Sequence, residues 1–265
     1  MAKFSKILVA NRSEIAVRVI KSIKNKGLQS VAIFAEGDEN SNHVNLADEA
    51  MCVGPSEVSE SYLNIKNILN AAKSSGADAI HPGYGFLSEN DDFSRECEAA
   101  GICFIGPSPE IIKLMGNKAE AKRKMIEIGV PCIPGYQSQE QSDKPLIEAA
   151  KEIGFPIMIK AAAGGGGRGM RLIDNPKDME SALSSARSEA LRSFGSDELI
   201  LEKALEKPLH IEVQVFGDKH GNYLHMGERD CSIQRRHQKV IEESPGPSIP
   251  MGLQEVMGST SVEII

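Results

Sequence analysis

The arrangement of apolar segments in residues 6–105 constrains the fold more than any other feature of this chain. Short apolar runs (KILVA, SVAIFA, AMCVG, ADAIHPG and ICFIG) are separated by helical patterns, including two near residues 65–72 and 91–100. In SEIAVRVIKSIKNKG, Ser13 is placed to cap the helix start and Gly27 its end. One face of this helix is apolar through Ile15, Val19, Ile20 and Ile23. Such alternation predicts an α/β fold with a parallel, Rossmann-like sheet covered by helices on both faces.

The first strand-to-helix turn of this half argues against a dinucleotide site. It reads ANRSEIA and so lacks the G-x-G-x-x-G glycines that let a pyrophosphate approach the start of a helix. A nicotinamide or flavin cofactor is therefore disfavoured there.

The second half of the chain has a different pattern. Two helical segments, SPEIIKLMG and NKAEAKRKMIEIG, are followed by Pro131 and Pro134, which break the pattern and place a boundary near residue 130. Beyond it we expect helices near 145–153 and 176–192 and the strands FPIMIKA, MRLID and ELILEKAL, with a glycine run as the turn between the first two strands. HIEVQVF, the turn GDKHGN and YLHMGERDCSIQ predict an antiparallel hairpin, and GLQEVMGSTSVEII predicts a final helix.

The composition narrows the class of protein. Among its 265 residues, 41% are hydrophobic and 25% are charged, as in ordinary globular proteins. The formal net charge is -7 and the acidic and basic residues are mixed along the sequence, which disfavours nucleic acid and anionic membranes as partners. Five widely spaced cysteines without a CxxC pair argue against disulfides and a zinc site. No apolar run is long enough for a signal peptide or a transmembrane helix. We therefore expect a protein of the cytoplasm, or of an equivalent organelle matrix, that binds neither nucleic acid nor membrane.

Four consecutive glycines, Gly164 to Gly167, carry a conformational cost that requires a reason. No Gly-Lys-Ser/Thr follows them, so they do not form a P-loop. A strand that carries Lys160 and then turns through glycines directs a cation and several N–H groups at one anion, and the glycines let the loop move as a lid. A loose hairpin turn is the alternative, although two residues suffice for a hairpin. The run therefore favours a phosphate-binding lid.

Three further segments are ambiguous on their own. LILEKAL, with Glu202 and Lys203, fits an edge strand with a solvated ion pair, or a strand that presents backbone groups to an adenine edge. HPGYGFLSEN follows a strand at the ligand-binding edge of such sheets, but its Pro-Gly and Tyr-Gly pairs also suit a plain loop. ERDCSIQRRHQKVIEE suits either a small anion or a salt-bridged surface, since it concentrates the cations of Arg229, Arg235, Arg236, His237 and Lys239.

Taken together, these motifs resemble one family, the biotin carboxylase component of biotin-dependent carboxylases, an ATP-grasp enzyme. The matching pieces occur in the family's order from Lys6 to about Pro247: KILVANRSEIAVRVI, SYLNI, AIHPGYGFLSEN, FIGPSPEIIKLMGNKAEAK, GVPCIPG, GFPIMIKAAAGGGGRGMR, LEKALEKPLHIEVQVFGDKHGN and ERDCSIQRRHQKVIEE. The resemblance implies a Rossmann-like (PreATP-grasp) domain at 1–116 and an incomplete ATP-grasp region at 117–265. Within that region, it implies a small lid domain at 132–204 and the start of a C-terminal domain at 205–265.

The resemblance also implies a reaction and its partners. ATP phosphorylates bicarbonate to carboxyphosphate, whose breakdown supplies CO2 to the ureido nitrogen of biotin on a biotin carboxyl carrier protein. In acetyl-CoA carboxylase this is the first half-reaction, ahead of a carboxyltransferase, in fatty acid synthesis. The complete protein is expected to be a homodimer with Arg18 near its interface.

The same resemblance assigns roles at the nucleotide. Lys118 and Lys160 match the lysines that contact the phosphates, and Gly166 and Gly167 belong to the lid above them. The adenine hinge, acting mainly through backbone groups, matches Glu202, Lys203, Ala204 and Leu205. The ribose contacts match His210 and Gln234. His237 matches a histidine near the phosphates, and Lys239 matches the lysine that holds bicarbonate.

Two departures from the family pattern matter. Ala163 stands where family members often have a further glycine, a small change at the edge of the lid. The family pattern also continues for well over a hundred residues past Ile265, with the paired glutamates that bind Mg2+ and a Glu-x-Asn-x-Arg run. We therefore expect no metal ligands within 1–265, and no carboxylase activity from these residues alone.

Several alternatives remain open at the level of sequence. The chain fits equally the front of a carboxylase that acts on pyruvate, another acyl-CoA or urea, because these share the module. A catalytically dead nucleotide-binding or dimerisation module is a second possibility. A carbamoyl phosphate synthetase or purine-pathway ligase is disfavoured by the joint presence of HPGYGFLSEN and QRRHQKV.

Overall fold

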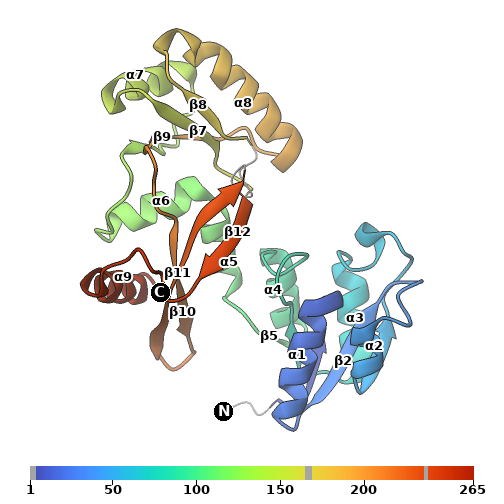
Figure 1. Ribbon diagram of the computed structural model, residues 1–265. Coiled ribbons are helices and arrows are strands. Elements are labelled where there is room, and N and C mark those ends of the chain that lie inside the picture. The colour runs from blue at the N-terminus through green and yellow to red at the C-terminus, as the bar shows by residue number, and fades with distance from the viewer. Residues whose placement is uncertain (1–3, 165–168, 236–237) are drawn as a thin grey trace. The chain divides into compact units, whose positions relative to one another are not determined.

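The computed structural model describes residues 4–164, 169–235 and 238–265, and the chain divides into two compact units, Met1–Met115 and Gly116–Ile265 (Figure 1). The first unit is built on a parallel sheet in the order β3-β2-β1-β4-β5. Its strands are β1 (Lys6–Val9), β2 (Gln29–Phe34), β3 (Glu49–Cys52), β4 (Ala79–His81) and β5 (Cys103–Phe104). This order, which reverses beside β1, is the doubly wound arrangement and confirms the predicted Rossmann-like sheet.

Helices cover both faces of this sheet because its central strands, β1 and β2, are apolar on both sides. The helices are α1 (Ser13–Asn25), α2 (Asn42–Leu46), η1 (Val58–Glu60), α3 (Ile65–Ser75), α4 (Asp91–Ala99) and α5 (Pro109–Gly116). On β1, Leu8 is buried in one apolar core with Ile68 of α3 and Phe93 of α4. Its neighbour Val9 points to the other face and is buried with Ile20 of α1.

The start of α1 differs from the prediction. Ser13 does not cap the helix but is its first residue, at φ 57°, and the extended residue before it makes no side-chain cap hydrogen bond. The side chain that organises this turn is Asn11, whose Nδ2 donates to the carbonyls of Pro82 and Tyr84, both at 2.8 Å. The turn is tied to the loop after β4, a tertiary contact that local capping preferences do not encode. Gly27 follows the end of α1 at φ 71°, as predicted.

The second unit contains a four-stranded antiparallel sheet in the order β6-β9-β7-β8. Its strands are β6 (Gly135–Tyr136), β7 (Ile157–Ala161), β8 (Arg171–Ile173) and β9 (Leu199–Lys203). Three helical segments accompany them: α7 (Asp143–Ile153), η2 (Pro176–Asp178) and α8 (Met179–Phe194). Buried residues of α7 and α8 form one core with Ile157, Ile159 and Leu201. β7 and β8 pair on either side of the glycine run, as predicted.

The edge-strand alternative for LILEKAL is wrong. β9 lies inside the sheet, paired with β7 on one side and β6 on the other. The Glu202 side chain is 12% exposed and is paired with two lysines instead of water. Local sequence did not reveal this arrangement, because the strand that covers the outer side of β9 is only two residues long and lies about 65 residues earlier in the chain.

Helix α6 (Lys118–Glu127) packs on the face of this sheet opposite to α7 and α8. Its Ala119 is buried with Ala162 and Ile200, and Ile200 points away from the core side because successive strand residues alternate. Asn117 caps the helix by accepting hydrogen bonds from backbone N–H groups of the first turn. The Lys118 N–H donates to the Ala162 carbonyl at 2.8 Å. The start of α6 is therefore fixed at the end of β7, where the glycine run begins.

A three-stranded antiparallel sheet and a helix complete the second unit. They are β10 (Ile211–Gly217), β11 (Tyr223–Arg235), β12 (Gln238–Glu243) and α9 (Met251–Glu263), with the strands in the order β10-β11-β12. The hairpin and the final helix were predicted, whereas β12 was not recognised because its charged sequence hides the strand. Large apolar side chains of this sheet stay exposed, including Phe216 (52%), Met226 (68%) and Val240 (63%).

Two predictions about the whole chain can be checked directly. All five cysteines are free, as expected. None of the helices in the part of the chain that the structure describes has the length and apolar composition needed to cross a membrane.

Candidate functional site

The two predicted phosphate lysines meet at the start of the glycine run. On β7, Ile157, Ile159 and Ala161 are buried, so the alternating Lys160 points to the other face of the sheet, the face on which α6 packs. Lys118, the first residue of α6, reaches the same place, where its Nζ donates to the carbonyl of Gly164. Lysines that lie about 40 residues apart in the sequence are thereby brought to one loop.

Glu202 joins this face from β9. It pairs in register with Met158, which places it diagonally across from Lys160, and its Oε2 lies 2.5 Å from Lys160 Nζ. Its other oxygen lies 2.7 Å from the Nζ of Lys122, one helical turn after Lys118. We call Lys118, Lys122, Lys160 and Glu202 the lysine cluster. It contains three ammonium groups and one carboxylate, an excess of positive charge that suits a polyphosphate.

The two described ends of the glycine run are both held by α8. Gly164 has φ 79° and lies against the ring of Phe194, which a Cβ at this position would strike. The Gly169 N–H donates to Glu189 at 3.2 Å, and Arg171 also binds that carboxylate. Gly166 and Gly167, the predicted lid residues, lie outside the described residues.

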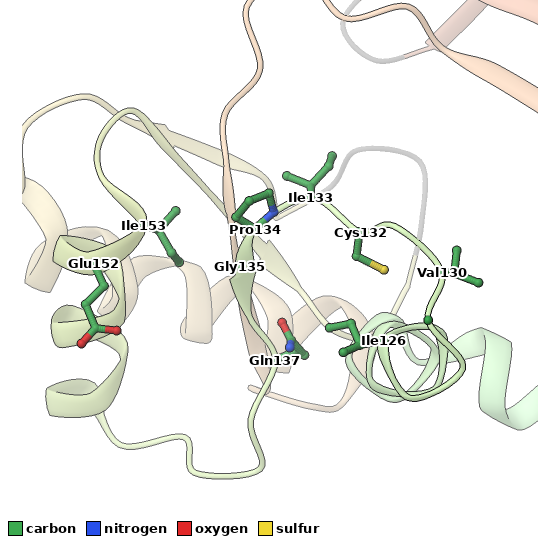
Figure 2. Close-up of a pocket in the computed structure, with 10 residues that line it drawn as sticks. Ile126, Val130, Cys132, Ile133, Pro134, Gly135, Gln137, Glu152 and Ile153 are labelled. Carbon is green, nitrogen blue, oxygen red and sulfur yellow. The ribbon is translucent and has the colours of Figure 1, made fainter. Parts of the chain in front are cut away.

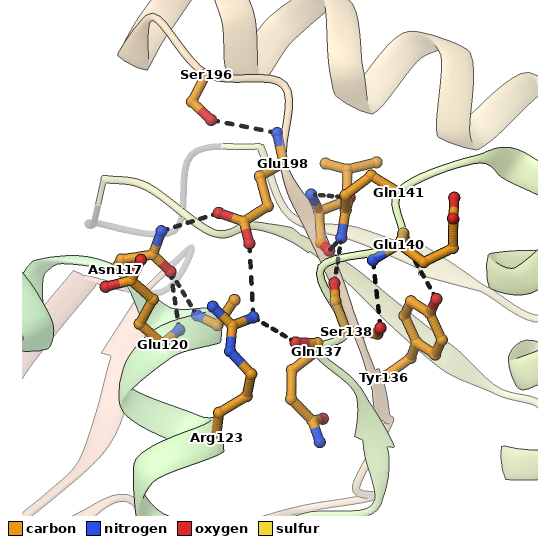
Figure 3. Close-up of polar contacts among 12 residues, drawn as sticks. Asn117, Glu120, Arg123, Tyr136, Gln137, Ser138, Glu140, Gln141, Ser196 and Glu198 are labelled. Carbon is orange, nitrogen blue, oxygen red and sulfur yellow. Dashed lines mark hydrogen bonds and ion pairs between the residues drawn. The ribbon is translucent and has the colours of Figure 1, made fainter.

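A second set of polar contacts fixes the start of α6 to the start of β9 (Figure 3). The Asn117 amide donates to one oxygen of Glu198 at 2.9 Å, and Arg123 lies 3.8 Å from the other oxygen. Arg123 also donates to the carbonyl of Gln137 at 2.5 Å. Since Lys118 follows Asn117 directly, these contacts determine where its ammonium group can reach.

The electrostatics of the lysine cluster favour an anionic ligand. Burial, and secondarily the positive charge of Lys160, lower the pKa of Lys118 below its ordinary value. Burial alone would raise the pKa of Glu202, but hydrogen bonds from Lys122 and Lys160 outweigh it and hold that pKa below its ordinary value. Glu202 is therefore ionised, and an added anion would relieve the repulsion between the lysines.

The predicted adenine hinge at residues 202–205 is anchored through its backbone. The Lys203 N–H donates to the Pro134 carbonyl at 2.8 Å, and the Ala204 N–H to the Pro156 carbonyl at 3.1 Å. The Lys203 ammonium binds two carbonyls of the loop before β7. Leu205 is 53% exposed. A role of these residues in binding adenine stays a prediction.

The remaining predicted site residues gather on the β10–β12 sheet. His210 Nδ1 and Gln234 Nε2 are 2.5 Å apart, and Gln234 pairs in register with Lys239. The Lys239 ammonium binds Glu212, which raises the pKa of Lys239. Glu212 also binds Arg229, so salt bridges neutralise these two cations of the segment. His237 lies outside the described residues, and among those described no hydrogen bond or ion pair joins this group to the lysine cluster.

Magnesium does not fit the acidic groups available here. In residues 4–164, 169–235 and 238–265, one set of side chains is arranged to hold a metal ion: Glu212, Cys231 and Glu242. Glu212 is already bound to Lys239 and Arg229, and a thiol is a poor ligand for a hard cation.

In the part of the chain that the structure describes, two surface pockets are lined by residues outside the lysine cluster. The larger, with a volume of about 610 Å³, is lined mainly by apolar residues around the end of α6 and the loop before β6, and none of the predicted site residues lines it (Figure 2). The smaller, about 290 Å³, lies in the first unit between the start of α1 and the HPGYGFLSEN loop. There the Tyr84 hydroxyl binds Glu14, and Asn11 holds the loop backbone.

Sequence reasoning missed four residues that organise these groups: Asn117, Lys122, Glu198 and Glu212. Lys122 had a usable signal, because it lies four residues after Lys118 on a predicted helix and so shares its face. Asn117 had the signal of a helix cap. The two glutamates gave none, since their partners come from other elements.

The comparisons with known proteins agree with this architecture. Residues 3–112 match the biotin carboxylase N-terminal domain, and residues 117–265 match the ATP binding domain of the carbamoyl-phosphate synthase L chain. A Rossmann-like unit followed by such an ATP-binding domain places the chain in the ATP-grasp class of folds. Within that class, the chain belongs to the biotin carboxylase family.

Individual relatives cover nearly all of this chain. It is 49% identical to the Nostoc sp. biotin carboxylase. The aligned region of 261 residues spans 98% of this chain and 58% of that protein. The chain is 52% identical over 258 residues to the mitochondrial methylcrotonoyl-CoA carboxylase subunit alpha of Dictyostelium discoideum, over 97% of this chain and 37% of that protein. The chain therefore spans less than two thirds of these relatives, and because one is mitochondrial, a cytoplasmic location stays a prediction.

A solved structure matches the whole chain. It is the biotin carboxylase domain dimer of the Hydrogenobacter thermophilus 2-oxoglutarate carboxylase, in complex with MgADP, ADP and bicarbonate. The TM-score is 0.94 at 47% identity, over 100% of this chain and 58% of that one.

Proposed function

We propose that this chain is part of a biotin carboxylase, which uses ATP and bicarbonate to carboxylate biotin on a biotin carboxyl carrier protein. The observation that carries the proposal is the convergence of Lys118 and Lys160 at Gly164, with an excess of positive charge where the glycine run begins. The complex between MgADP, bicarbonate and the similar Hydrogenobacter domain supports the same ligands here.

In this proposal, Lys118 and Lys160 hold the ATP phosphates, and Gly166 and Gly167 close over them as part of a lid at 132–204. Residues 202–205 meet the adenine, and His210 and Gln234 the ribose. A bicarbonate oxygen attacks the terminal phosphorus, ADP leaves, and carboxyphosphate forms. Carboxyphosphate then breaks down to CO2 and phosphate, the phosphate takes the proton of the biotin ureido N–H, and the nitrogen bonds to CO2. The contribution of the protein is mainly positioning and charge neutralisation, for which lysines and backbone N–H groups are suited.

Lys239 is the residue proposed to hold bicarbonate, with His237 near the phosphates. Its ammonium now binds Glu212, which also binds Arg229. Because Glu212 has a second cation, Lys239 can turn to a bicarbonate oxygen while the carboxylate keeps a partner. No step is assigned to Mg2+, since the described acidic groups do not fit it.

The proposal extends to the assembly. Acetyl-CoA carboxylase, with its carboxyltransferase, is the complex that we favour, and a pyruvate, other acyl-CoA or urea carboxylase is the alternative. The methylcrotonoyl-CoA and 2-oxoglutarate carboxylases among the relatives show that this module occurs in several complexes. We further propose a homodimer with Arg18, an exposed residue of α1, near the interface.

A chimera tests the proposed activity. Residues 1–265 are joined to the remainder of the Nostoc biotin carboxylase, and ATP hydrolysis that depends on bicarbonate and free biotin is measured. We expect Lys160→Met and Lys239→Met each to lower the rate by about 100-fold or more, since each removes a charged contact made in the transition state. Lys124→Met, on the exposed side of α6, is the control and keeps the rate of the parent. A chimera that binds ATP without turnover would instead indicate a catalytically dead module.

Residues 1–265 alone are expected to show no such turnover, because the family's magnesium ligands are not among them. The same assay applied to the 265-residue chain tests this, and clear magnesium-dependent turnover would refute it.

A further inference from the structure

Lys122 is a buried lysine for which the proposed reaction has no role. It lies on α6, one turn after Lys118, and its side chain is only 9% exposed. Lysines are almost never buried unless they are paired, and its Nζ lies 2.7 Å from Oε1 of Glu202. The site is shaped for the ammonium group: a Cβ on Gly135 of β6 would lie 2.9 Å from Lys122 Nζ and closer still to the Leu201 carbonyl.

Glu202 is shared between two lysines, one on each oxygen. Oε1 binds Lys122 and Oε2 binds Lys160, and the exposed fractions are 9% for Lys122, 12% for Glu202 and 25% for Lys160. The cation nearer to solvent is therefore Lys160, the residue proposed to contact phosphates. The deeper cation, Lys122, binds the other oxygen of the carboxylate.

This arrangement matters when an anion binds. Lys160 has to turn its ammonium group from Glu202 toward the phosphates. If Glu202 had no other partner, that movement would leave a buried carboxylate unpaired, which is strongly unfavourable. Because Lys122 stays on the other oxygen, Glu202 remains neutralised while Lys160 moves.

We propose that Lys122 is a positioning residue, the permanent counterion of Glu202 that releases Lys160 to bind the phosphates of a nucleoside triphosphate. The inference rests on the proposed function, in which Lys160 contacts those phosphates. The affinity of the protein for phosphates then depends on Lys122 only while Glu202 carries its negative charge.

A double-mutant cycle on the 265-residue chain tests this, with MgATP affinity measured by calorimetry and adenosine affinity by competition. We expect Lys122→Met to weaken MgATP binding about tenfold or more, because Glu202 then retains Lys160. In Glu202→Gln the carboxylate is gone, so adding Lys122→Met to that variant should change its MgATP affinity by less than about threefold. Adenosine has no phosphates, so Lys122→Met should leave its affinity unchanged both in the wild-type background and in the Glu202→Gln background. Lys124→Met, which removes an exposed lysine of the same helix, is the matched control.

The outcomes separate the explanations. If Lys122 were merely structural, Lys122→Met would weaken the binding of adenosine and MgATP equally, and adding Glu202→Gln to Lys122→Met would not restore MgATP binding. Either result overturns the inference. A Lys122→Met protein that binds MgATP like wild type overturns it as well. Should Lys122→Met fail to fold, Lys122→Gln/Glu202→Gln is compared with Glu202→Gln, and a loss of about tenfold or more in MgATP affinity overturns the inference. A wild-type chain that binds no MgATP overturns the proposed function and this inference with it.

Discussion

At the scale of single residues, the pKa of a charged side chain in this protein depends on the partner to which it is hydrogen-bonded. Burial alone would raise the pKa of Glu212, but hydrogen bonds from Lys239 and Arg229 outweigh it and lower that pKa. The hydrogen bond with Glu212 in turn raises the pKa of Lys239 against the opposing effect of burial. Lys118 has no carboxylate partner among the described contacts; its ammonium binds a backbone carbonyl, and its pKa is lowered by burial and by Lys160. A residue in that state gains most from an anionic ligand.

The lowered pKa of Lys118 predicts a pH-dependent affinity for ATP. A bound polyphosphate raises this pKa, because it offsets the burial and the repulsion from Lys160, so ATP binds better to the protonated lysine. The ATP affinity should therefore be full below the pKa that Lys118 has in the ligand-free protein and should fall as the pH rises through that pKa. This pKa lies below the ordinary lysine value of 10.5. Calorimetric titrations across the alkaline range measure this. Lys118→Met should lose that part of the pH dependence, and an unchanged slope in the variant would contradict the assignment.

At the scale of elements, the start of α6 is the critical feature. One asparagine caps the helix, binds Glu198 and precedes Lys118, while the next N–H is bound to the Ala162 carbonyl. The helix therefore begins at a fixed point on the sheet, and the direction of Lys118 follows from that point.

This predicts that Asn117→Ala weakens both stability and ATP binding. Loss of the cap should cost about 1 kcal/mol of unfolding free energy. The matched control is Asn64→Ala, which removes the equivalent cap of α3 in the first unit, where the Asn64 side chain accepts from the Asn67 N–H. Denaturant unfolding should show similar losses for the two variants, whereas calorimetry should show weaker ATP binding only for Asn117→Ala. Equal effects on ATP binding would mean that the cap acts through general stability.

At the scale of the whole molecule, the elements differ in how well they are covered. Strands β1 and β2 are buried on both faces between helices, whereas the β10–β12 sheet keeps large apolar side chains exposed and every residue of β12 is exposed. Local stability follows the number of buried apolar contacts, so the cooperative units of this chain should open separately.

Hydrogen exchange measures that difference. In the 265-residue chain, amides of β10–β12 should exchange faster than those of β1, β2, β7 and β9, because fewer buried side chains resist opening. The chimera with the Nostoc remainder provides the comparison, and there the protection of β10–β12 should rise. Protection of β10–β12 equal to that of β1 in the 265-residue chain would show that this sheet is stable as it stands.

The sequence by itself determined the α/β class, the parallel sheet of the first unit and most strands of the second, because apolar periodicity and turn residues are local signals. Its motifs also identified the family. Only the tertiary structure decided that β9 is an interior strand, that Ser13 does not cap α1, and that Lys122 and Lys160 both bind Glu202. The physical reason is that these features depend on pairing between distant segments. The local sequence LILEKAL is the same whether its carboxylate is surrounded by water or by two lysines. Only the packing of distant segments distinguishes these two environments.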